Sequence, residues 1–198
     1  MSSAVLIQHQ PAEEWKQPSR GIVGMACLIA AESAIFIIFV VAYIFYLGKS
    51  LSGPTPREVL DLPILSTICL LSSSITVHFA VHELRANKVS RSAWWLAATV
   101  LLGSIFIAGT AREWYELIYR HGLTIRTNLF GTTFYSLVGL HASHVIAGLI
   151  MLGLALIFSL MGKVNSNHAE RLEVLSIYWH FVDAVWVVVF TVVYVLGR

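Results

Sequence analysis

Apolar residues dominate five long segments of the chain, and short polar stretches separate them. The segments cover about 21–47, 62–82, 93–119, 129–161 and 173–196. A helix rises about 1.5 Å per residue, so a segment of about 20 residues crosses the roughly 30 Å hydrocarbon core of a bilayer. The pattern therefore predicts an all-α integral membrane protein, built as a bundle of five transmembrane helices.

The composition agrees with a protein that lies almost wholly within a membrane. Of 198 residues, 57% are hydrophobic and only 12% are charged, whereas soluble domains carry about 25% charged residues. The first 20 residues differ, because they contain Pro11, Glu13 and Lys16 but no apolar stretch. We expect a polar N-terminal tail over 1–20, not a cleavable signal peptide, and a transmembrane domain over 21–198. The net charge of +2 gives no indication of a nucleic-acid partner.

Five crossings place the two ends of the chain on opposite sides of the membrane. Seven of the 13 Lys and Arg residues fall on the N-terminal side and six fall on the other side. The short loop after the second segment carries Arg85, Lys88 and Arg91, and compact basic clusters of this kind favour the cytoplasmic side. The charges predict an N-terminus inside and a C-terminus outside.

Small residues in the apolar segments indicate how the helices pack. Gly139, Ser143 and Ala147 recur every four residues in the fourth segment, and such a ridge predicts the close approach of another helix. Cys27 and Cys69 lie within apolar segments and show no Cys-x-x-Cys spacing. We interpret both as small core residues.

Glu32 lies near the middle of the first segment. A charged carboxylate at that depth costs several kcal/mol unless it is paired, hydrated or protonated. Phe36, Phe39 and Tyr43 follow on the same helical face and are expected to shield it. Two interpretations remain open: a carboxylate that exchanges a proton or contacts a lipid headgroup or partner helix, and a structural hydrogen bond between helices.

The last segment carries His180 and Asp183, three residues apart on one helical face, with Glu173 on the same broad face. Trp179 and Trp186 border this face. We expect a polar seam that faces protein. Hydrogen bonding to a neighbouring helix is favoured over a proton path, because a path needs titratable groups across the whole bilayer.

Two further groups of polar residues lie in or beside the apolar segments. His141 with His144, and His78 with His82, have spacings at which imidazoles can chelate a metal, but no His-Glu-x-x-His motif or further ligand accompanies them. Hydrogen bonds across helices are the favoured interpretation. Glu113 belongs to the run 112–116, where charges and aromatic residues alternate at the expected membrane boundary and predict local salt bridges.

Two motifs make the chain resemble subunit III of the haem-copper respiratory oxidases, the family shared by cytochrome c oxidases and bacterial ubiquinol oxidases. One is the run Tyr178–Trp186, which includes the signature residues Trp179, Phe181 and Trp186. The other is Phe130–Phe134 followed by Gly139–Gly148. The resemblance covers all five segments, but the family's long form has seven helices and this chain lacks the first two.

The resemblance implies a role for the chain and for its polar residues. It implies a non-catalytic subunit, without haem or copper of its own, in a bacterial plasma-membrane complex that reduces oxygen to water. The expected partners are the catalytic subunit I, subunit II, phospholipids and a larger respiratory assembly, and the expected role includes support of proton uptake. Glu32 stands where the family keeps a carbodiimide-sensitive membrane glutamate. The implied inter-helix or lipid-contact set is Glu32, Glu113, His141, His144, Glu173, His180 and Asp183.

Three alternatives to an oxidase subunit remain open at this point. One is the subunit III homologue associated with nitric oxide reductase. Another is a small proton-coupled transporter, in which Glu32 and the face of His180 and Asp183 would line a continuous aqueous path. The third is a membrane metalloenzyme that uses the histidine pairs. The choice between cytochrome c and quinol as electron donor depends on another subunit.

Overall fold

The computed structural model describes residues 19–50 and 52–197, and this part of the chain contains helices and no strands. The elements are α1 (Arg20–Tyr46), α2 (Pro56–Val59), α3 (Ile64–Arg85), α4 (Val89–Tyr119), α5 (Leu129–Leu160), a short turn η1 (Ser166–His168), α6 (Ala169–Phe190) and η2 (Thr191–Leu196). The polar tail that we predicted lies outside the described residues, apart from its last two positions.

Five helical stretches are long and apolar enough to cross a membrane: α1, α3, α4, α5 and the continuous run Ser166–Leu196. The predicted five-helix, all-α bundle is therefore confirmed. Most ends lie within a few residues of the predicted ones. Two helices begin earlier than predicted: α4 begins at Val89 and not near residue 93, and α6 begins at Ala169 and not near residue 173. The first turn of α6 places Ala169 and Leu172 in the core and leaves Glu170 and Arg171 exposed. A search for continuous apolar sequence therefore misses this turn.

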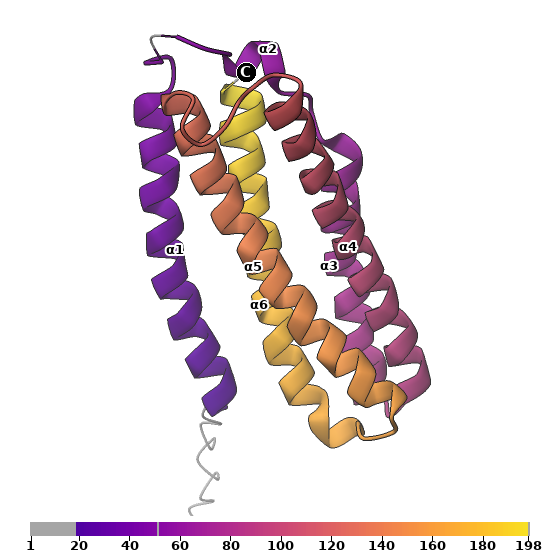
Figure 1. Cartoon of the computed structure of the whole chain (residues 1–198). Helices are drawn as coiled ribbons and strands as arrows, with labels where there is room; N and C mark the ends of the chain where they lie inside the picture. Colours follow the sequence, from indigo (N-terminus) through magenta and orange to yellow (C-terminus); the bar gives the residue numbers. More distant parts are fainter. Residues whose placement is uncertain (1–18, 51, 198) are drawn as a thin grey trace, which may run out of the picture.

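The helices run roughly parallel and antiparallel to one another (Figure 1), and α5 and α6 each pack against three other helices. α3 and α4 form an antiparallel pair, α4 also packs against α5, and α6 packs against α3, α5 and α1. α1 lies at the edge of the bundle and packs mainly against α5 and α6. α1 begins at the end of the bundle opposite to the end of η2 (Figure 1).

Asn128 connects the start of α5 to the loop that follows α1. Its side-chain oxygen accepts a hydrogen bond from the Gly131 N–H at 2.8 Å, as expected of an N-cap residue. Its side-chain nitrogen donates to the carbonyl oxygens of Ser52 and Pro54, each at 3.1 Å. One side chain therefore caps a transmembrane helix and fixes a loop that is 74 to 76 residues distant in sequence.

The close approach of helices occurs at glycines other than the predicted ridge. The Trp179 ring of α6 is fully buried, and it lies where a Cβ atom on Gly148 of α5 would come within 2.7 Å of it. A Cβ on Gly103 of α4 would come within 2.9 Å of the same ring. Of the predicted ridge, only Gly139 faces another helix, with Trp114 of α4 at 3.4 Å from where its Cβ would lie, whereas Ser143 and Ala147 are exposed.

The prediction that both cysteines are core residues was wrong for Cys27. Cys27 is exposed on α1, whereas Cys69 is half-buried on α3. α1 leaves most of its surface free of the other helices, as Ile37 and Ile38 show with exposed fractions of 62% and 66%. An apolar residue of a membrane helix need not face protein, because lipid tails are as apolar as a core side chain.

Candidate functional site

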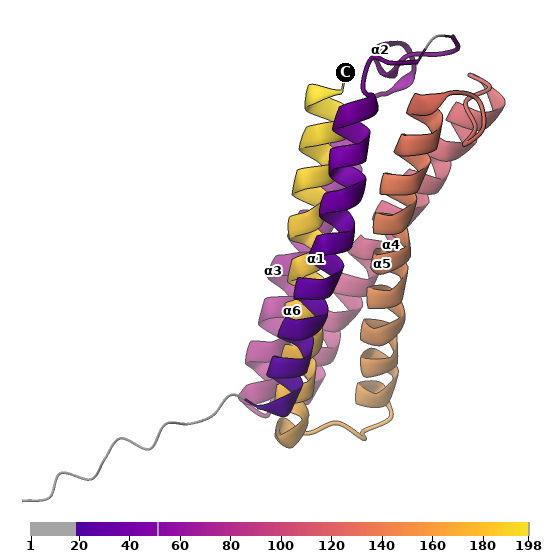
Figure 2. The same cartoon turned by 90° about the vertical axis from the view of Figure 1, so that its left-hand side faces the viewer.

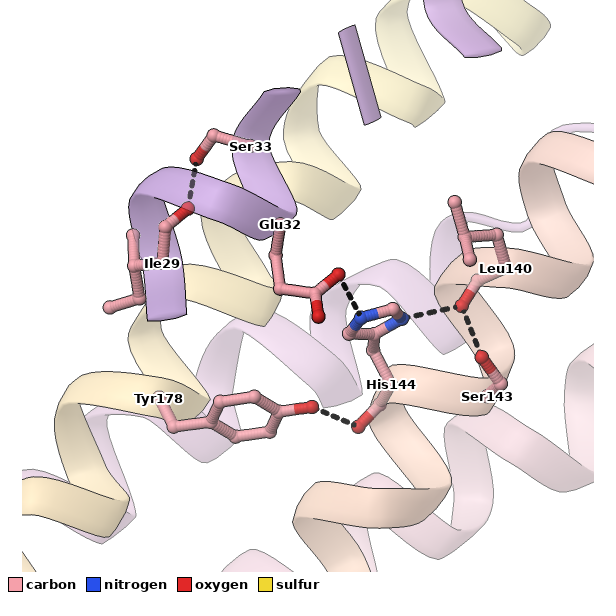
Figure 3. A network of polar contacts seen from close by, with 7 residues as sticks. All are labelled: Ile29, Glu32, Ser33, Leu140, Ser143, His144 and Tyr178. Atoms are coloured by element: carbon pink, nitrogen blue, oxygen red, sulfur yellow. Dashed lines mark hydrogen bonds and ion pairs between the residues drawn. The ribbon is translucent and has the colours of Figure 1, made fainter. Parts of the chain in front are cut away.

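Glu32 of α1 contacts His144 of α5 (Figure 3). The Glu32 Oε2 atom lies 3.1 Å from His144 Nε2. The other ring nitrogen, Nδ1, lies 2.8 Å from the carbonyl oxygen of Leu140, one turn earlier on the same helix. The Tyr178 hydroxyl of α6 donates to the His144 carbonyl oxygen at 3.2 Å, so three helices meet at this residue.

These contacts fix one proton of the pair and restrict the position of a second. A carbonyl oxygen only accepts hydrogen bonds, so Nδ1 of His144 carries a proton. Nε2 then either donates to an ionised Glu32 or accepts a hydrogen bond from a protonated Glu32. Both arrangements are neutral overall, and in each a second proton lies between His144 Nε2 and Glu32 Oε2. A pair of this kind lowers the cost of an ionisable carboxyl group within a membrane helix.

Aromatic rings cover part of the Glu32–His144 pair. The Phe36 ring centroid lies 5.0 Å from that of His144 and 6.3 Å from that of Phe181 on α6. Of the three aromatic residues that were expected to shield Glu32, Phe36 is almost wholly buried and lies against the imidazole that binds Glu32. The shield is incomplete, because the Glu32 side chain keeps 25% of its surface exposed and that of His144 keeps 14%.

Ser74 of α3 binds both ionisable residues in the centre of α6. Its hydroxyl donates to a carboxylate oxygen of Asp183, and its oxygen lies 3.0 Å from Nδ1 of His180. Because the Ser74 hydroxyl has one proton, it accepts from His180 while it donates to Asp183. The Ser176 hydroxyl, 3.1 Å from Nε2, then supplies the other hydrogen bond of the imidazole.

The two signature tryptophans of α6 bind hydroxyl groups on the same helix, α3. Trp179 Nε1 donates to the Ser73 hydroxyl at 2.8 Å, and Trp186 Nε1 donates to the Thr67 hydroxyl at 3.1 Å. Both rings are fully buried. Hydroxyl residues of α3 therefore satisfy buried indole N–H groups that would otherwise cost free energy in the apolar interior.

Glu173 of α6 forms an ion pair with Arg85 at the end of α3. The Glu173 Oε2 atom lies 2.5 Å from an Arg85 guanidinium nitrogen, and the side chains are 33% and 54% exposed. Solvent screens an ion pair this exposed, so its net contribution is about 1 kcal/mol or less. Together, Glu173, His180 and Asp183 all face α3.

Glu113 of α4 connects α4 to η2 at the opposite end of the bundle. The Tyr194 hydroxyl, on η2, lies 2.9 Å from each of the two Glu113 carboxylate oxygens. The local salt bridge that the run 112–116 predicts is also present, between Arg112 and Glu116 at 3.3 Å. The carboxylate of Glu113 itself therefore bonds across helices, whereas its charged neighbours pair within their own helix.

His141 is fully buried and surrounded by aromatic rings. Its ring is stacked on Trp186 at 5.0 Å and meets Phe106 edge-on at 5.9 Å. Neither ring nitrogen has a hydrogen-bond partner in the described part of the chain. The structure thus separates the roles of the two neighbouring histidines, because His144 binds Glu32 and His141 packs among aromatic rings.

The arrangement of the histidines differs from a chelating site. Both ring nitrogens of His144 are engaged, with Glu32 and with the Leu140 carbonyl. His78 and His82 are exposed on α3, beside a small polar pocket of about 190 Å³. Residues 19–50 and 52–197 contain no group of three His, Cys, Asp or Glu side chains placed to hold a metal ion.

Sequence reasoning identified one partner in most of these contacts and missed the other. The missed partners are Ser73, Ser74, Thr67, Arg85 and Tyr194. The run Ser72–Ser74 was a visible signal, because hydroxyl residues within a membrane helix commonly bind neighbouring helices.

Comparison with known proteins gives a consistent result over nearly the whole chain. The family model described as cytochrome c oxidase subunit III matches residues 18–198. A cytochrome c oxidase subunit 3 from Bacillus sp. (strain PS3) is 33% identical over 176 residues, which cover 88% of this chain and 84% of the relative.

Two further relatives broaden this result. A cytochrome c oxidase subunit 3 from Synechocystis sp. is 37% identical over 188 residues, 90% of this chain and 77% of the relative. A probable quinol oxidase subunit 3 from Staphylococcus saprophyticus is 30% identical over 177 residues, 88% of each chain. With these matches and its five-helix membrane fold, the chain belongs to the cytochrome c oxidase subunit III family.

Proposed function

We propose that the chain is the non-catalytic subunit III of a haem-copper terminal oxidase that reduces oxygen to water with electrons from cytochrome c or quinol. It lies in a bacterial plasma membrane with its N-terminus inside, packs against the catalytic subunit I in a complex with subunit II, and contacts phospholipids. Haem and copper belong to its partners. Family membership supports the proposal, since the matched relatives are oxidase subunits.

The Glu32–His144 pair carries the more specific part of the proposal, which is support of proton uptake. Glu32 lies close to the middle of α1, where an ionisable group is costly. A hydrogen bond between two helices needs only a serine or an asparagine, so an ionisable pair exceeds what packing alone requires. One proton lies between Nε2 and Oε2 of the pair, and Glu32 keeps a quarter of its side-chain surface exposed. It can therefore take up or release a proton.

Substitution of Glu32 by glutamine tests this role within the intact complex. Glutamine keeps the size and a hydrogen bond to His144 but cannot ionise. We expect Glu32→Gln to preserve subunit composition and haem content, to slow proton uptake, and to lower the number of turnovers before inactivation. The matched control is Glu170→Gln, an exposed position at the start of α6.

Two results would contradict the proton role. One is a Glu32→Gln complex that takes up protons and survives turnover as the unsubstituted complex does. The other is loss of the chain from the complex in Glu32→Gln, which would show that the carboxyl group acts in assembly alone.

A further inference from the structure

A polar pocket of about 190 Å³ opens between α3 and α6. The end of α3 and the start of α6 lie at the same end of the bundle as the start of α1 (Figure 2). The lining of the pocket includes His78 and His82 of α3 and His180 of α6. His78 and His82 are exposed, whereas His180 is half-buried. The pocket therefore brings three imidazoles together at the surface of the bundle.

His78 lies within the membrane-spanning part of α3. Seven residues separate it from Arg85, the last residue of the helix, which is roughly 10 Å of helix. Within residues 19–50 and 52–197, its imidazole forms no hydrogen bond or ion pair, and its ring meets that of Phe79 at 6.2 Å between centroids. Lipid tails offer no partner to either ring nitrogen, so an exposed imidazole at this depth is costly. A polar group from outside the chain would remove this cost.

The charges around the pocket favour an acidic partner. Glu173 also lines the pocket, but it forms an ion pair with Arg85 at 2.5 Å. Asp183, on the same helix as Glu173, is bound by Ser74. Both carboxyl groups are thus engaged elsewhere, and the imidazole of His78 remains without one. A carboxyl group forms charge-assisted hydrogen bonds with an imidazole, which are stronger than bonds between neutral groups. A carboxyl group on a partner is therefore the complement of this surface.

The surface around His78 has the shape of a contact line for another helix. The exposed strip of α3 consists of residues at spacings of four, three and four: Leu71, Ile75, His78 and His82. The strip extends over roughly 16 Å, is apolar in one half and carries both imidazoles in the other. On α6, which packs against α3, Ala184 is also exposed. Its small side chain lets a neighbouring helix approach closely.

We propose that this strip of α3 is the docking surface for a transmembrane helix of a partner subunit, and that an Asp or Glu of that helix bonds to His78. Apolar residues of the partner cover Leu71 and Ile75. A phospholipid would leave His78 uncovered, because its phosphate lies at the membrane surface, about two turns of helix away. The inference rests on the proposed function, since it assigns a surface and a chemistry to the association with other oxidase subunits.

A photoreactive residue identifies what lies against the strip. His78→p-benzoylphenylalanine is introduced into the full chain, the native membranes are irradiated, and the complex is purified through a tag on this chain. We expect mass spectrometry to find an adduct on a transmembrane segment of an oxidase subunit, beside an Asp or Glu. The control is Trp94→p-benzoylphenylalanine, at a position near the start of α4 that is 78% exposed. It should give no adduct on that segment.

Retention of the partner measures the bond itself. His78→Leu should shorten the time for which the partner stays with this chain in mild detergent by about 10-fold, because the carboxyl group of the partner loses its bond. Replacement of that carboxyl residue by alanine should have the same effect, and the two changes together should cause no further loss. The matched control is Ser104→Leu, at an exposed position on α4 whose hydroxyl bonds within its own helix. It should leave retention unchanged.

The outcomes separate this proposal from the proposed function. Oxidase subunits that copurify without a protein adduct at position 78 would overturn the docking surface and leave the proposed function standing. An adduct on lipid alone, or a partner retained equally long by the His78→Leu chain, would do the same. Absence of every oxidase subunit from the purified chain would overturn both.

Discussion

Glu32 and His144 show how single residues connect the edge helix to the rest of the bundle. α1 has few buried residues. Among the described residues, the contact between Glu32 and His144 is its one ion pair with another helix. The imidazole is fixed from the other side by the Leu140 carbonyl, so its orientation does not depend on Glu32. Loss of either partner should therefore leave the other in place, partly buried and unpaired.

A double-mutant cycle on this pair measures the coupling directly. We expect Glu32→Ala and His144→Ala each to destabilise the chain by about 1–3 kcal/mol, because each leaves a partly buried polar group unsatisfied. The double variant should lose less than the sum, with a coupling energy of about 0.5–3 kcal/mol. The free energy of unfolding in mixed micelles is the measurement, and strict additivity would show that the contact contributes nothing.

Ser74 offers a second test at the residue scale. Ser74→Ala removes the hydroxyl that serves both His180 and Asp183, and should cost about 1–3 kcal/mol of unfolding free energy. The matched control is Ser104→Ala, because the exposed Ser104 hydroxyl bonds only to the Val100 carbonyl of its own helix. Equal effects of the two substitutions on the unfolding midpoint would exclude Ser74 as a link between α3 and α6.

The sequence identified the polar residues of the bundle more readily than their partners. Glu32, His180 and Asp183 stand out because each is an ionisable residue in an apolar segment. Helical periodicity gives the direction of each side chain, but it contains no information on which helix lies opposite. For this reason His141 and His144 were one group in the sequence, whereas in the structure His141 stacks on Trp186 and His144 binds Glu32.

Among the elements, α6 organises the packing through its large side chains. Trp179 is fully buried, beside glycines of α4 and α5 that leave room for the ring. Its indole N–H bonds to α3. One side chain thus touches all three neighbouring helices on that side, and the glycines are required by the volume of the tryptophan.

Substitution of Gly148 tests this packing. A methyl group there would lie 2.7 Å from the Trp179 ring, so Gly148→Ala should destabilise the chain by about 1–3 kcal/mol through overpacking. Gly153, on the same helix, has no atom within 4 Å of the added Cβ. Gly153→Ala should be neutral or stabilise by up to about 1 kcal/mol. The measurement is the thermal unfolding midpoint of both variants. A Gly148→Ala chain as stable as the Gly153→Ala chain would contradict the close packing of Trp179 on Gly148.

Element boundaries followed from hydropathy where polar loops interrupt the apolar sequence, as they do on both sides of α3. Hydropathy missed the first turn of α6, because a turn that is half buried and half exposed has no strong average character. The spacing of small residues predicted a ridge on α5 of which only Gly139 faces another helix. Small residues mark a possible contact, but the large residue that needs the space lies on a different helix and selects Gly148.

At the scale of the whole molecule, polar links lie at several depths of an otherwise apolar bundle. Arg85 and Glu173 connect helices at one end, Glu113 and Tyr194 connect them at the other, and the Ser74 contacts lie between. Large apolar side chains remain exposed along the outer faces, on α1 above all. Such faces suit lipid or a membrane partner, in keeping with the proposed position within a larger complex.

The central claim is that this chain is a stable subunit of a haem-copper oxidase. It is tested most directly by gentle extraction through a tag on this chain, followed by mass spectrometry of the retained proteins and an optical spectrum. The proposal predicts a large catalytic subunit and a haem spectrum in stoichiometric amounts. A colourless chain without an oxidase subunit after gentle extraction would contradict it.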